Sequence, residues 1–435
     1  MTTARMSIGA LALACGAGQG ESATESATDS STTGAPEEVR YTLHTPLQGT
    51  ETFLRDPEGA LVQSWESSTF PAVSTFLLPG GDLLRTGVVG TAFVSPGVGG
   101  LIERQSWDGA PRWSFTYSDQ DHRLHHDIEP LPSGNILAIA WERKSPEETS
   151  AAGRDPATID ELEGLWPDTV IEIDPTTDTI VWEWHVWDHL VQDFDSNAPN
   201  FADISARPER IDLNFVDVTG PQLSDWNHFN GIGYNPELDQ IVLSAHHFHE
   251  IWVIDHSTTS AEAASSSGGR AGRGGDLLYR WGNPGAYGAD GAQQLYHQHD
   301  PRWIPEGLPG AGDLTIVNNG LPEIRPYTTV VQITPPLAED GTYPLSEGVY
   351  GPALPTWEYK ADPPESFFTE IVGSAQRLPS GNTLINQGII GRFFIVTPDG
   401  AIVWEKNHGA RIFRVDSFAA EDPQLAGQDL TPGEG

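Results

Sequence analysis

Cysteine is nearly absent from this chain of 435 residues, which contains only Cys15. A single cysteine excludes an intrachain disulfide, so the fold must be stabilised by burial of apolar side chains. Basic residues are also scarce, since 23 Lys and Arg face 61 Asp and Glu and give a formal net charge of −38. A surface of this charge repels nucleic acid and anionic lipid head groups, which predicts no nucleic-acid partner and favours a monomer.

Long apolar runs are missing as well. No stretch of about 20 consecutive apolar residues occurs, so no transmembrane helix is expected. The N-terminus carries a shorter signal, in which Arg5 precedes the small apolar run Ile8–Ala14 and the run ends at Cys15. This pattern is similar to a truncated secretory signal with lipoprotein-type processing at the cysteine. The alternative is a disordered tail with an incidental cysteine.

The segment that follows favours export. Gly16–Glu38 is rich in Ser, Thr, Glu, Ala and Gly and has no aromatic residue, which is typical of a flexible tether. We therefore expect a signal or lipoprotein-type segment over residues 1–15, this linker, a folded domain over 39–420 and a disordered tail over 421–435. The protein is expected to be exported to the periplasm or the cell surface, with membrane contact only through an N-terminal lipid anchor.

A tryptophan-centred segment recurs along the chain, and the number of its copies predicts the number of units in a repeat. The six copies are Gln63–Glu66, Pro111–Ser114, Val181–Trp184, Tyr279–Gly282, Thr356–Tyr359 and Val403–Lys406. Most copies are followed by a strand, a turn and a strand, and the turn Pro-Ser-Gly-Asn is identical at Pro132–Asn135 and Pro379–Asn382. Short-stranded units repeated around a channel are typical of a propeller. The sequence therefore predicts an all-β, six-bladed β-propeller.

Both ends of the folded region are expected to share one blade. The strands after Trp404 are too few for a full blade, so Tyr41–Asp56 is expected to complete it and close the ring. Three interruptions of the repeat are predicted. Ala151–Glu163 is expected to be a polar loop, Leu190–Ser224 a short helical excursion over one face, and Thr258–Gly275 a mobile surface loop.

The histidines follow the repeat. They gather at the entry to the strand after the tryptophan segment, in His122–Asp127, Asp225–Asn230 and Tyr296–Asp300, and a further group lies at His246–His249. The innermost strand of each blade lines the channel of a propeller, so equivalent positions converge at one channel mouth. Adjacent Asp or Asn side chains can fix the tautomer of an imidazole. A lone histidine is more commonly structural, but three equivalent copies indicate a functional site.

Arginines accompany these histidines. Arg123 and Arg302 lie beside the histidine motifs, Arg325 follows Asn318–Gly320, and Arg377 lies in the fifth copy of the repeat. In a chain with so few basic residues, this placement indicates an anion-binding site. A surface salt bridge is an equal alternative for Arg302 and Arg377.

Several of these segments are family signatures when taken together. They are His125–Asp127, Asp225–Asn230, Gln298–Asp300, Asn318–Gly320 with Arg325, and Ser374–Leu384. In this order they resemble the arylsulfotransferase (aryl-sulfate sulfotransferase) family, over about Phe76 to Lys406. The resemblance implies a six-bladed propeller and an exported enzyme that does not use a nucleotide sulfate donor. It also implies transfer of a sulfuryl group from an aryl sulfate to a phenol through a sulfated histidine.

The resemblance also implies residue roles, with one departure. It makes His228 and His299 the paired channel histidines, Arg325 the sulfate-binding arginine and His126 their neighbour. The family's sulfated histidine lies in the blade after the Asn-Gly…Arg motif, but this chain has no histidine between His299 and His408. Either another histidine takes the place of the nucleophile, or the chain does not transfer sulfate by the family's route.

The catalytic roles are therefore predicted for the histidines that are present. His228 or His299 is expected to attack sulfur, and His126 to orient the nucleophile or act as the acid. The substrate-binding residues are expected to be Arg325, Asn319, His125 and Asn227. Small aryl sulfates and phenols are the expected partners, and neither a cofactor nor a metal is expected in this site.

Two other classes of function stay open. The His-x-His spacings His247–His249 and His297–His299 suit strands whose side chains point the same way, and such a set could bind a divalent metal. A metal site would indicate a hydrolase, lactonase or lyase. The third hypothesis is a ligand-binding propeller that has lost its nucleophile, which the missing fifth-blade histidine favours. Metal content and acceptor-dependent turnover distinguish the three.

Overall fold

Six antiparallel sheets of four strands repeat along the residues that the computed structural model describes, which are 40–90, 93–215, 224–339 and 341–433. The first sheet contains β4 (Pro71–Leu77), β5 (Leu83–Val88), β6 (Gly100–Gln105) and β7 (Pro111–Thr116). The second contains β8 (His122–Pro130), β9 (Ile136–Glu142), β10 (Asp168–Asp174) and β11 (Thr179–His185). The third contains β14 (Phe229–Asn235), β15 (Gln240–Ala245), β16 (Glu250–Asp255) and β17 (Tyr279–Trp281). The next two are β18 (His299–Trp303), β19 (Leu314–Asn318), β20 (Thr329–Ile333) and β23 (Trp357–Lys360); and β24 (Ser374–Arg377), β25 (Thr383–Gln387), β26 (Arg392–Val396) and β27 (Ile402–Asn407). We number these sheets as blades one to five.

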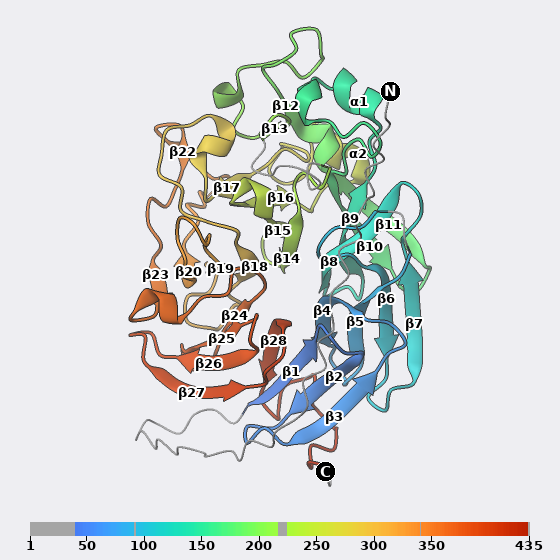
Figure 1. The fold of residues 1–435 in the computed structure, drawn as a ribbon, viewed down its shortest axis with the longest axis vertical. Coiled ribbons are helices and arrows are strands. Elements are labelled where there is room, and N and C mark those ends of the chain that lie inside the picture. The colour runs from blue at the N-terminus through green and yellow to red at the C-terminus, as the bar shows by residue number, and fades with distance from the viewer. Residues whose placement is uncertain (1–39, 91–92, 216–223, 340, 434–435) are drawn as a thin grey trace, which may run out of the picture. The chain divides into compact units, whose positions relative to one another are not determined.

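Blade six is built from both ends of the folded region. β28 (Ile412–Phe418) pairs antiparallel with β1 (Tyr41–Pro46), and the sheet continues through β2 (Glu51–Arg55) to β3 (Leu61–Glu66). Figure 1 shows dark red β28 beside blue β1. The predicted completion of the last blade by Tyr41–Asp56 is confirmed, and so is the all-β, six-bladed propeller.

Among the described residues, an indole N–H bond from a recurring tryptophan joins every blade except blade five to the next one. Trp65 Nε1, on the outermost strand β3, donates to the carbonyl of Ser106 at 3.0 Å, and Trp357 Nε1, on β23, donates to that of Pro398 at 2.8 Å. The same kind of bond joins Trp113 to Asp178, Trp182 to Thr258, Trp184 to Gly275 and Trp281 to Pro352. Every acceptor lies between the third and fourth strands of the following blade. The indole N–H needs a partner when its ring is buried, and this repeated bond supplies it.

The first strand of each blade is the innermost. β4, β8, β14, β18, β24 and β28 contact one another in that order and surround the channel. His126 lies at a register shift within β8, His228 directly precedes β14 and His299 begins β18, so the ring order of the strands brings these residues toward one point.

The predicted interruptions contain short regular elements. The predicted polar loop Ala151–Glu163 begins at the last residue of α1 (Pro146–Ala151) and includes η1 (Pro156–Thr158). A capping box formed by Ser145 and Glu148 stabilises the start of α1. Over the described part of residues 190–224, where a helical excursion was expected, the structure has one 3-10 turn, η3 (Ile204–Ala206), and a parallel pair of strands, β12 (Leu190–Val191) and β13 (Ile211–Asp212). The loop predicted to be mobile, Thr258–Gly275, contains the helical turn α2 (Ser260–Ala263). The remaining short elements are η2 (Val186–His189), η5 (His246–Phe248), η6 (Pro284–Tyr287), η7 (Pro364–Ser366), β21 (Leu345–Ser346) and β22 (Val349–Tyr350).

The predictions for the two ends have different outcomes. The signal segment 1–15 with Cys15 and the linker 16–38 lie outside the described residues. The tail predicted to be disordered differs from expectation over residues 421–433. Leu425 is buried against the core of blade six, and Gln428 Nε2 donates to the carbonyl of Gly80 at 2.8 Å. In the described part of the chain, no helix has the length and apolar character needed to cross a membrane.

Candidate active site

Eight histidines from blades two, three and four meet at one end of the inner strands. They are His125, His126, His228, His246, His247, His249, His297 and His299. The ring centroids lie 4.6 Å apart for His126 and His228, 4.6 Å for His228 and His247, and 4.3 Å for His246 and His297. All but the half-buried His297 are buried. The structure therefore brings the three predicted catalytic histidines, His126, His228 and His299, into one cluster.

A left-handed backbone turns some of these side chains out of their strands. The φ angle is 46° at His126, 54° at His228 and 53° at His297. Residues other than glycine seldom adopt this region, and each such residue costs on the order of 1–3 kcal/mol that the surrounding structure must offset. Val372, which lies in blade five just before β24, has the same conformation, with φ of 54°. Blade five therefore has this backbone turn without an imidazole.

His228 forms a buried ion pair with Asp225. Nδ1 of His228 lies 2.6 Å from Oδ2 of Asp225, and Trp141 Nε1 donates to the other carboxylate oxygen at 2.9 Å. Burial lowers the pKa of His228, but the negative charge and hydrogen bond of Asp225 outweigh it, so the pKa is raised overall. Burial likewise opposes the charge of Asp225, yet contact with His228 holds the pKa of this carboxyl at about 2. Asp225 thus fixes Nδ1–H of His228 and turns Nε2 toward the cluster.

His125 supports His126 from behind. The two Nδ1 atoms lie 2.9 Å apart, and Nε2 of His125 is 2.8 Å from Oδ1 of Asp168. Trp141 stacks on His125 with ring centroids 3.8 Å apart. Burial lowers the pKa of both imidazoles, so both are neutral at neutral pH. His125 therefore orients His126.

His299 is held by blades four and five together. Its Nδ1 donates to Oδ1 of Asn319 at 2.8 Å and to the carbonyl of His297 at 3.1 Å. Its Nε2 accepts from the backbone N–H of Val372 at 3.3 Å. Burial lowers the pKa of His299 to about 4, so the ring is neutral and its Nε2 lone pair faces a donor. The structure makes His299 less available as a nucleophile than His228.

The two predicted asparagines are buried in the frame of the site. Asn319 Nδ2 donates to the carbonyls of Thr369 at 2.7 Å and Val372 at 2.8 Å, while Oδ1 receives the His299 proton. Asn227 Oδ1 accepts from the backbone N–H of Asp168 at 3.3 Å. Both side chains are fully buried. They position the histidines and the neighbouring backbone.

The arginines predicted to bind an anion have other partners. Arg325 donates to the carbonyls of Asn318 and Tyr327, at 3.3 Å and 2.9 Å, and its guanidinium lies 4.2 Å from the Tyr327 ring centroid. Arg123 donates to backbone carbonyls, Arg302 pairs with Asp300 and Asp416, and Arg377 donates to Gln332. The sequence alone did not indicate which of the many carboxylate and carbonyl groups each arginine would contact. The charge of an anion at the histidines must be met by imidazoles.

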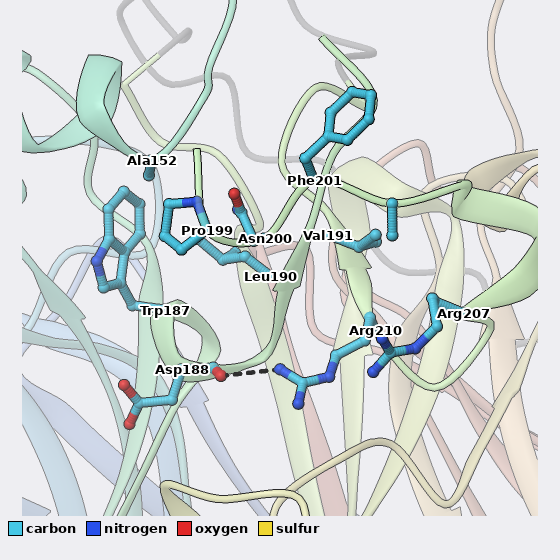
Figure 2. Close-up of a pocket in the computed structure, with 11 residues that line it drawn as sticks. Ala152, Trp187, Asp188, Leu190, Val191, Pro199, Asn200, Phe201, Arg207 and Arg210 are labelled. Atoms are coloured by element: carbon cyan, nitrogen blue, oxygen red, sulfur yellow. Dashed lines mark hydrogen bonds between the residues drawn. The ribbon is translucent and has the colours of Figure 1, made fainter. Parts of the chain in front are cut away.

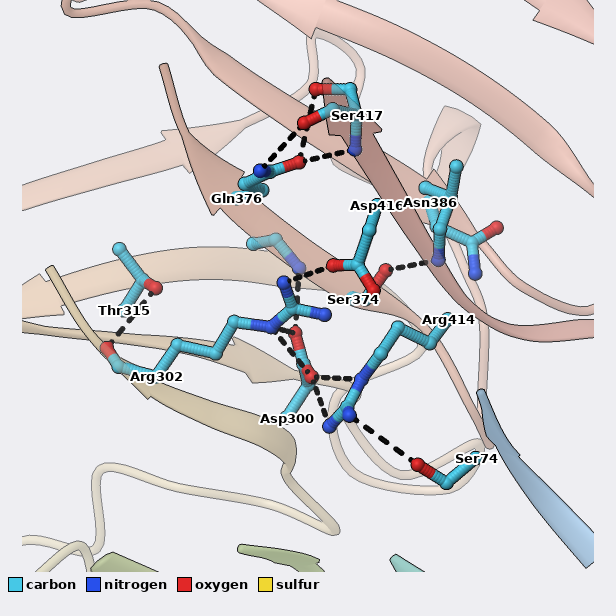
Figure 3. Close-up of polar contacts among 12 residues, drawn as sticks. Ser74, Asp300, Arg302, Thr315, Ser374, Gln376, Asn386, Arg414, Asp416 and Ser417 are labelled. Carbon is cyan, nitrogen blue, oxygen red and sulfur yellow. Dashed lines mark hydrogen bonds and ion pairs between the residues drawn. The ribbon is translucent and has the colours of Figure 1, made fainter. Parts of the chain in front are cut away.

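A buried polar network forms the floor beneath the histidines and joins all six blades. Arg414 on β28 lies 2.6 Å from Oδ2 of Asp127 and 3.0 Å from Oδ1 of Asp300. These two carboxylates directly follow His126 and His299 in the sequence. They also accept from Ser74 Oγ, Ile232 N and Ala375 N, at 2.6, 3.2 and 2.9 Å. Figure 3 shows Arg414 between Asp300 and Ser74. Sequence reasoning missed Arg414, although two buried His-Asp pairs require a cation nearby.

Two hollows lie away from the histidines. One hollow, of about 680 Å³, is lined by residues that include Glu129, Arg302 and Asp416. These three residues come two positions after Asp127, Asp300 and Arg414 on the inner strands. The hollow therefore lies on the side of the floor network away from the histidines. The other, of about 350 Å³, is lined by residues that include Trp187 and Arg210 (Figure 2). Arg210 pairs with Asp276 at 3.1 Å. Neither hollow contains a histidine, so the cluster is the better place for nucleophilic chemistry.

The strand assignment of the two His-x-His pairs was wrong. His246–Phe248 forms the 3-10 turn η5, and His249 ends it with a left-handed φ of 57°. His297 also has a left-handed backbone and precedes β18. The turn η5 connects β15 to β16, the second and third strands of blade three. His246 reaches His228 instead, with ring centroids 5.1 Å apart.

Comparison with known proteins gives one informative match. The family model described as arylsulfotransferase (ASST) matches residues 109–417. Among solved structures, the chain is similar to a protein of unknown function from Bacteroides caccae, with 10% identity, 88% of this chain and 99% of that chain covered, and a TM-score of 0.48. It is also similar to virginiamycin B lyase from Staphylococcus aureus, with 11% identity, coverage of 84% and 79%, and a TM-score of 0.40. Neither likeness carries functional information. A search of curated proteins gave no match.

Proposed function

This chain belongs to the arylsulfotransferase (ASST) family and is therefore a sulfotransferase, and we propose that it transfers a sulfuryl group from an aryl sulfate to a phenol through His228. Membership of the family implies small aryl sulfates and phenols as substrates. The observation that supports His228 as nucleophile is its pairing with Asp225 at the centre of the histidine cluster, at 2.6 Å.

Two features favour His228 over His299 as the attacking group. The Nδ1–H of His228 is bound by Asp225, and Nε2 makes no hydrogen bond within the described residues, so its lone pair is available. An adjacent carboxylate also makes an imidazole more basic. In contrast, the lone pair of His299 Nε2 accepts from Val372 N–H. His299 is then suited to hold the backbone of Val372 beside the cluster while His228 attacks.

The proposed reaction has two steps that share one intermediate. Nε2 of neutral His228 attacks sulfur, an N–S bond forms, and the S–O bond to the aryl group breaks with its electron pair leaving on the phenolate. The oxygen of an acceptor phenol then attacks the same sulfur, and the N–S electron pair returns to Nε2. The proton lost by the acceptor balances the proton gained by the released phenolate. Such a scheme has ping-pong kinetics.

The neighbouring imidazoles have a binding role in this scheme. His126 lies with its ring centroid 4.6 Å from that of His228, and burial keeps both His126 and His299 neutral. A neutral imidazole still carries one N–H donor. Donors fixed in a buried site stabilise the charge that develops on sulfuryl oxygens without reorganising. We assign His126 to this role, with His125 holding its ring.

The test is turnover of p-nitrophenyl sulfate in buffer treated with a chelator. Wild-type protein is expected to release nitrophenol in a manner that depends on an added phenol. His228→Ala is expected to lose this turnover, and His299→Ala to retain part of it with a weaker apparent affinity. His122→Ala is the matched control, because His122 is partly exposed and bonds to Asp119. No turnover by wild type, or full turnover by a folded His228→Ala protein, would refute the proposal.

We also propose that the protein is exported and lipid-anchored at Cys15. The support is the pattern of Arg5, the apolar run Ile8–Ala14 and the tether that follows. The expected result is recovery of the protein in the membrane fraction, and its release on Cys15→Ser substitution. An unchanged distribution of the variant would contradict the anchor.

A further inference from the structure

Three of the clustered histidines have the arrangement of a metal site. One ring nitrogen from each of His228, His246 and His247 lies within 4.8 Å of the nitrogens of the other two, and all three side chains are buried. Two of these residues come from η5 and the third precedes β14. A metal ion with Zn–N distances of about 2.0–2.1 Å holds its ligand nitrogens no more than about 4.2 Å apart, so these three need to close only slightly around an ion.

The backbone holds the ligands in place before any ion arrives. The N–H of His246 donates to the carbonyl of His228 at 3.3 Å, and the N–H of His247 donates to that of Asn227 at 3.3 Å. The η5 turn is therefore bonded directly to the segment that carries His228. A set of ligands fixed in this way loses little conformational freedom on binding.

Asp225 orients two of the three imidazoles. Its carboxylate accepts from Nδ1 of His228 at 2.6 Å, and its backbone carbonyl accepts from Nδ1 of His247 at 2.9 Å. Both rings therefore carry their proton on Nδ1 and present the Nε2 lone pair. Metal-binding histidines almost always donate their other N–H to a carboxylate or a carbonyl in this manner.

His246 supplies an independent indication of a ligand. Its Nδ1 is buried and has no hydrogen-bond partner among the described residues, and only 8% of the residue is exposed. A buried polar atom without a partner is costly and calls for an explanation such as an ion or a ligand.

We propose that His228, His246 and His247 bind one divalent first-row transition-metal ion of the class that prefers imidazole, with Zn²⁺ and Co²⁺ as its representatives. Imidazole nitrogens suit such ions, whereas Mg²⁺ and Ca²⁺ require oxygen ligands. Three protein ligands leave a fourth position open, which is the pattern of sites that act on a small ligand rather than purely structural ones. His126, with its ring centroid 4.6 Å from that of His228, is an adjacent imidazole outside the set.

This site goes beyond the proposed sulfuryl transfer and shares His228 with it. The ion would occupy the Nε2 lone pair that attacks sulfur, so the two uses exclude each other. Binding is therefore measured directly rather than through turnover. Transfer in chelated buffer without metal binding would refute only the metal site, and metal binding without transfer would refute only the transfer.

The experiment uses the full chain without a histidine tag, stripped with a chelator and titrated with Co²⁺ and then Zn²⁺. Equilibrium dialysis is expected to give one tightly held ion per chain, with a visible Co²⁺ spectrum typical of a four-coordinate site that Zn²⁺ abolishes. His246→Ala and His247→Ala are expected to lose this site. Asp225→Asn is expected to weaken it by ~10–100-fold. His122→Ala is expected to bind as wild type does.

His246→Ala is the variant least exposed to a folding failure, because its Nδ1 has no hydrogen bond to lose within the described residues. Circular dichroism establishes that the variant is folded before it is titrated. Wild-type protein that binds no ion under these conditions would overturn the proposal. Equal affinity in wild type and folded His246→Ala would overturn it as well.

Discussion

Oδ2 of Asp225 lies 2.6 Å from Nδ1 of His228, in a pair that is buried on both sides. The carboxylate belongs to the same segment as the histidine, so this contact is local and belongs to blade three alone. It sets the proton position of the residue at the centre of the cluster. The first prediction concerns this pair.

Asp225→Asn is expected to slow sulfuryl transfer by roughly 10²–10⁴-fold, as when a carboxylate that fixes a catalytic tautomer becomes an amide. The wild-type pKa of His228 is raised above 6.5, and His228 attacks only when neutral, so the rate rises with pH through that pKa. Without the negative charge of Asp225 the pKa of His228 falls, so the rise in rate moves to lower pH. The pH profile of kcat/KM measures this shift. A rise in rate at an unchanged pH would show that it does not come from the ionisation of His228.

A second prediction tests the placement of His126. A Cβ added to Gly97 would lie 2.0 Å from Cε1 of His126, so Gly97→Ala is expected to displace the ring and lower turnover. Gly109→Ala is a matched control, because both glycines have φ of 79° and nothing lies within 4 Å of a Cβ at Gly109. Both variants carry the same backbone strain. Equal turnover in the two variants would contradict a role for His126.

A third prediction concerns the floor network. Arg414→Gln leaves Asp127 and Asp300 buried without their shared cation, and is expected to lower the free energy of unfolding by about 3–5 kcal/mol. Arg392→Gln is the comparison, since it breaks the more exposed pair with Glu405 and is expected to cost about 0–1 kcal/mol. Urea unfolding of both variants measures the difference. Similar midpoints for the two variants would contradict the account of the network.

A fourth prediction combines the two proposals. Zn²⁺ bound by His228, His246 and His247 would remove the attacking lone pair, so addition of Zn²⁺ is expected to suppress sulfuryl transfer and a chelator to restore it. His246→Ala, which lacks one ligand, is expected to be less sensitive. Initial rates across a Zn²⁺ titration measure this. A rate that increases with Zn²⁺ would instead favour metal-dependent chemistry at the site.

The fold was predictable because its signal is local and repeated. Each copy of the tryptophan segment marks an outermost strand, and in five of the six blades an indole bond to the next blade, such as that from Trp65 to Ser106, gives a reason for the recurrence. The histidines were predictable as a cluster for a related reason, since His126, His228 and His299 lie on or directly before the inner strands of successive blades. A ring of blades turns equal sequence positions into spatial neighbours.

The partners of charged groups were not predictable in the same way. Arg414 meets Asp127 across 287 positions of sequence, and no local pattern connects the two. Arg325 was expected to face an anion, but its guanidinium satisfies the carbonyls of its own loop. The contact between the His246 and His228 rings was not predicted from the sequence for another reason. A strand was expected at His247–His249, and the chain forms the turn η5 there.

The central claim is that His228 carries the sulfuryl group between donor and acceptor. The most direct measurement is mass spectrometry of the protein, kept at neutral or alkaline pH, after exposure to an aryl sulfate without an acceptor phenol. We predict a gain of one sulfuryl group that maps to the peptide containing His228, disappears when a phenol is added, and is absent from His228→Ala. A sulfuryl group on a different residue, or turnover by the wild type with no modified protein at any time, would contradict the account.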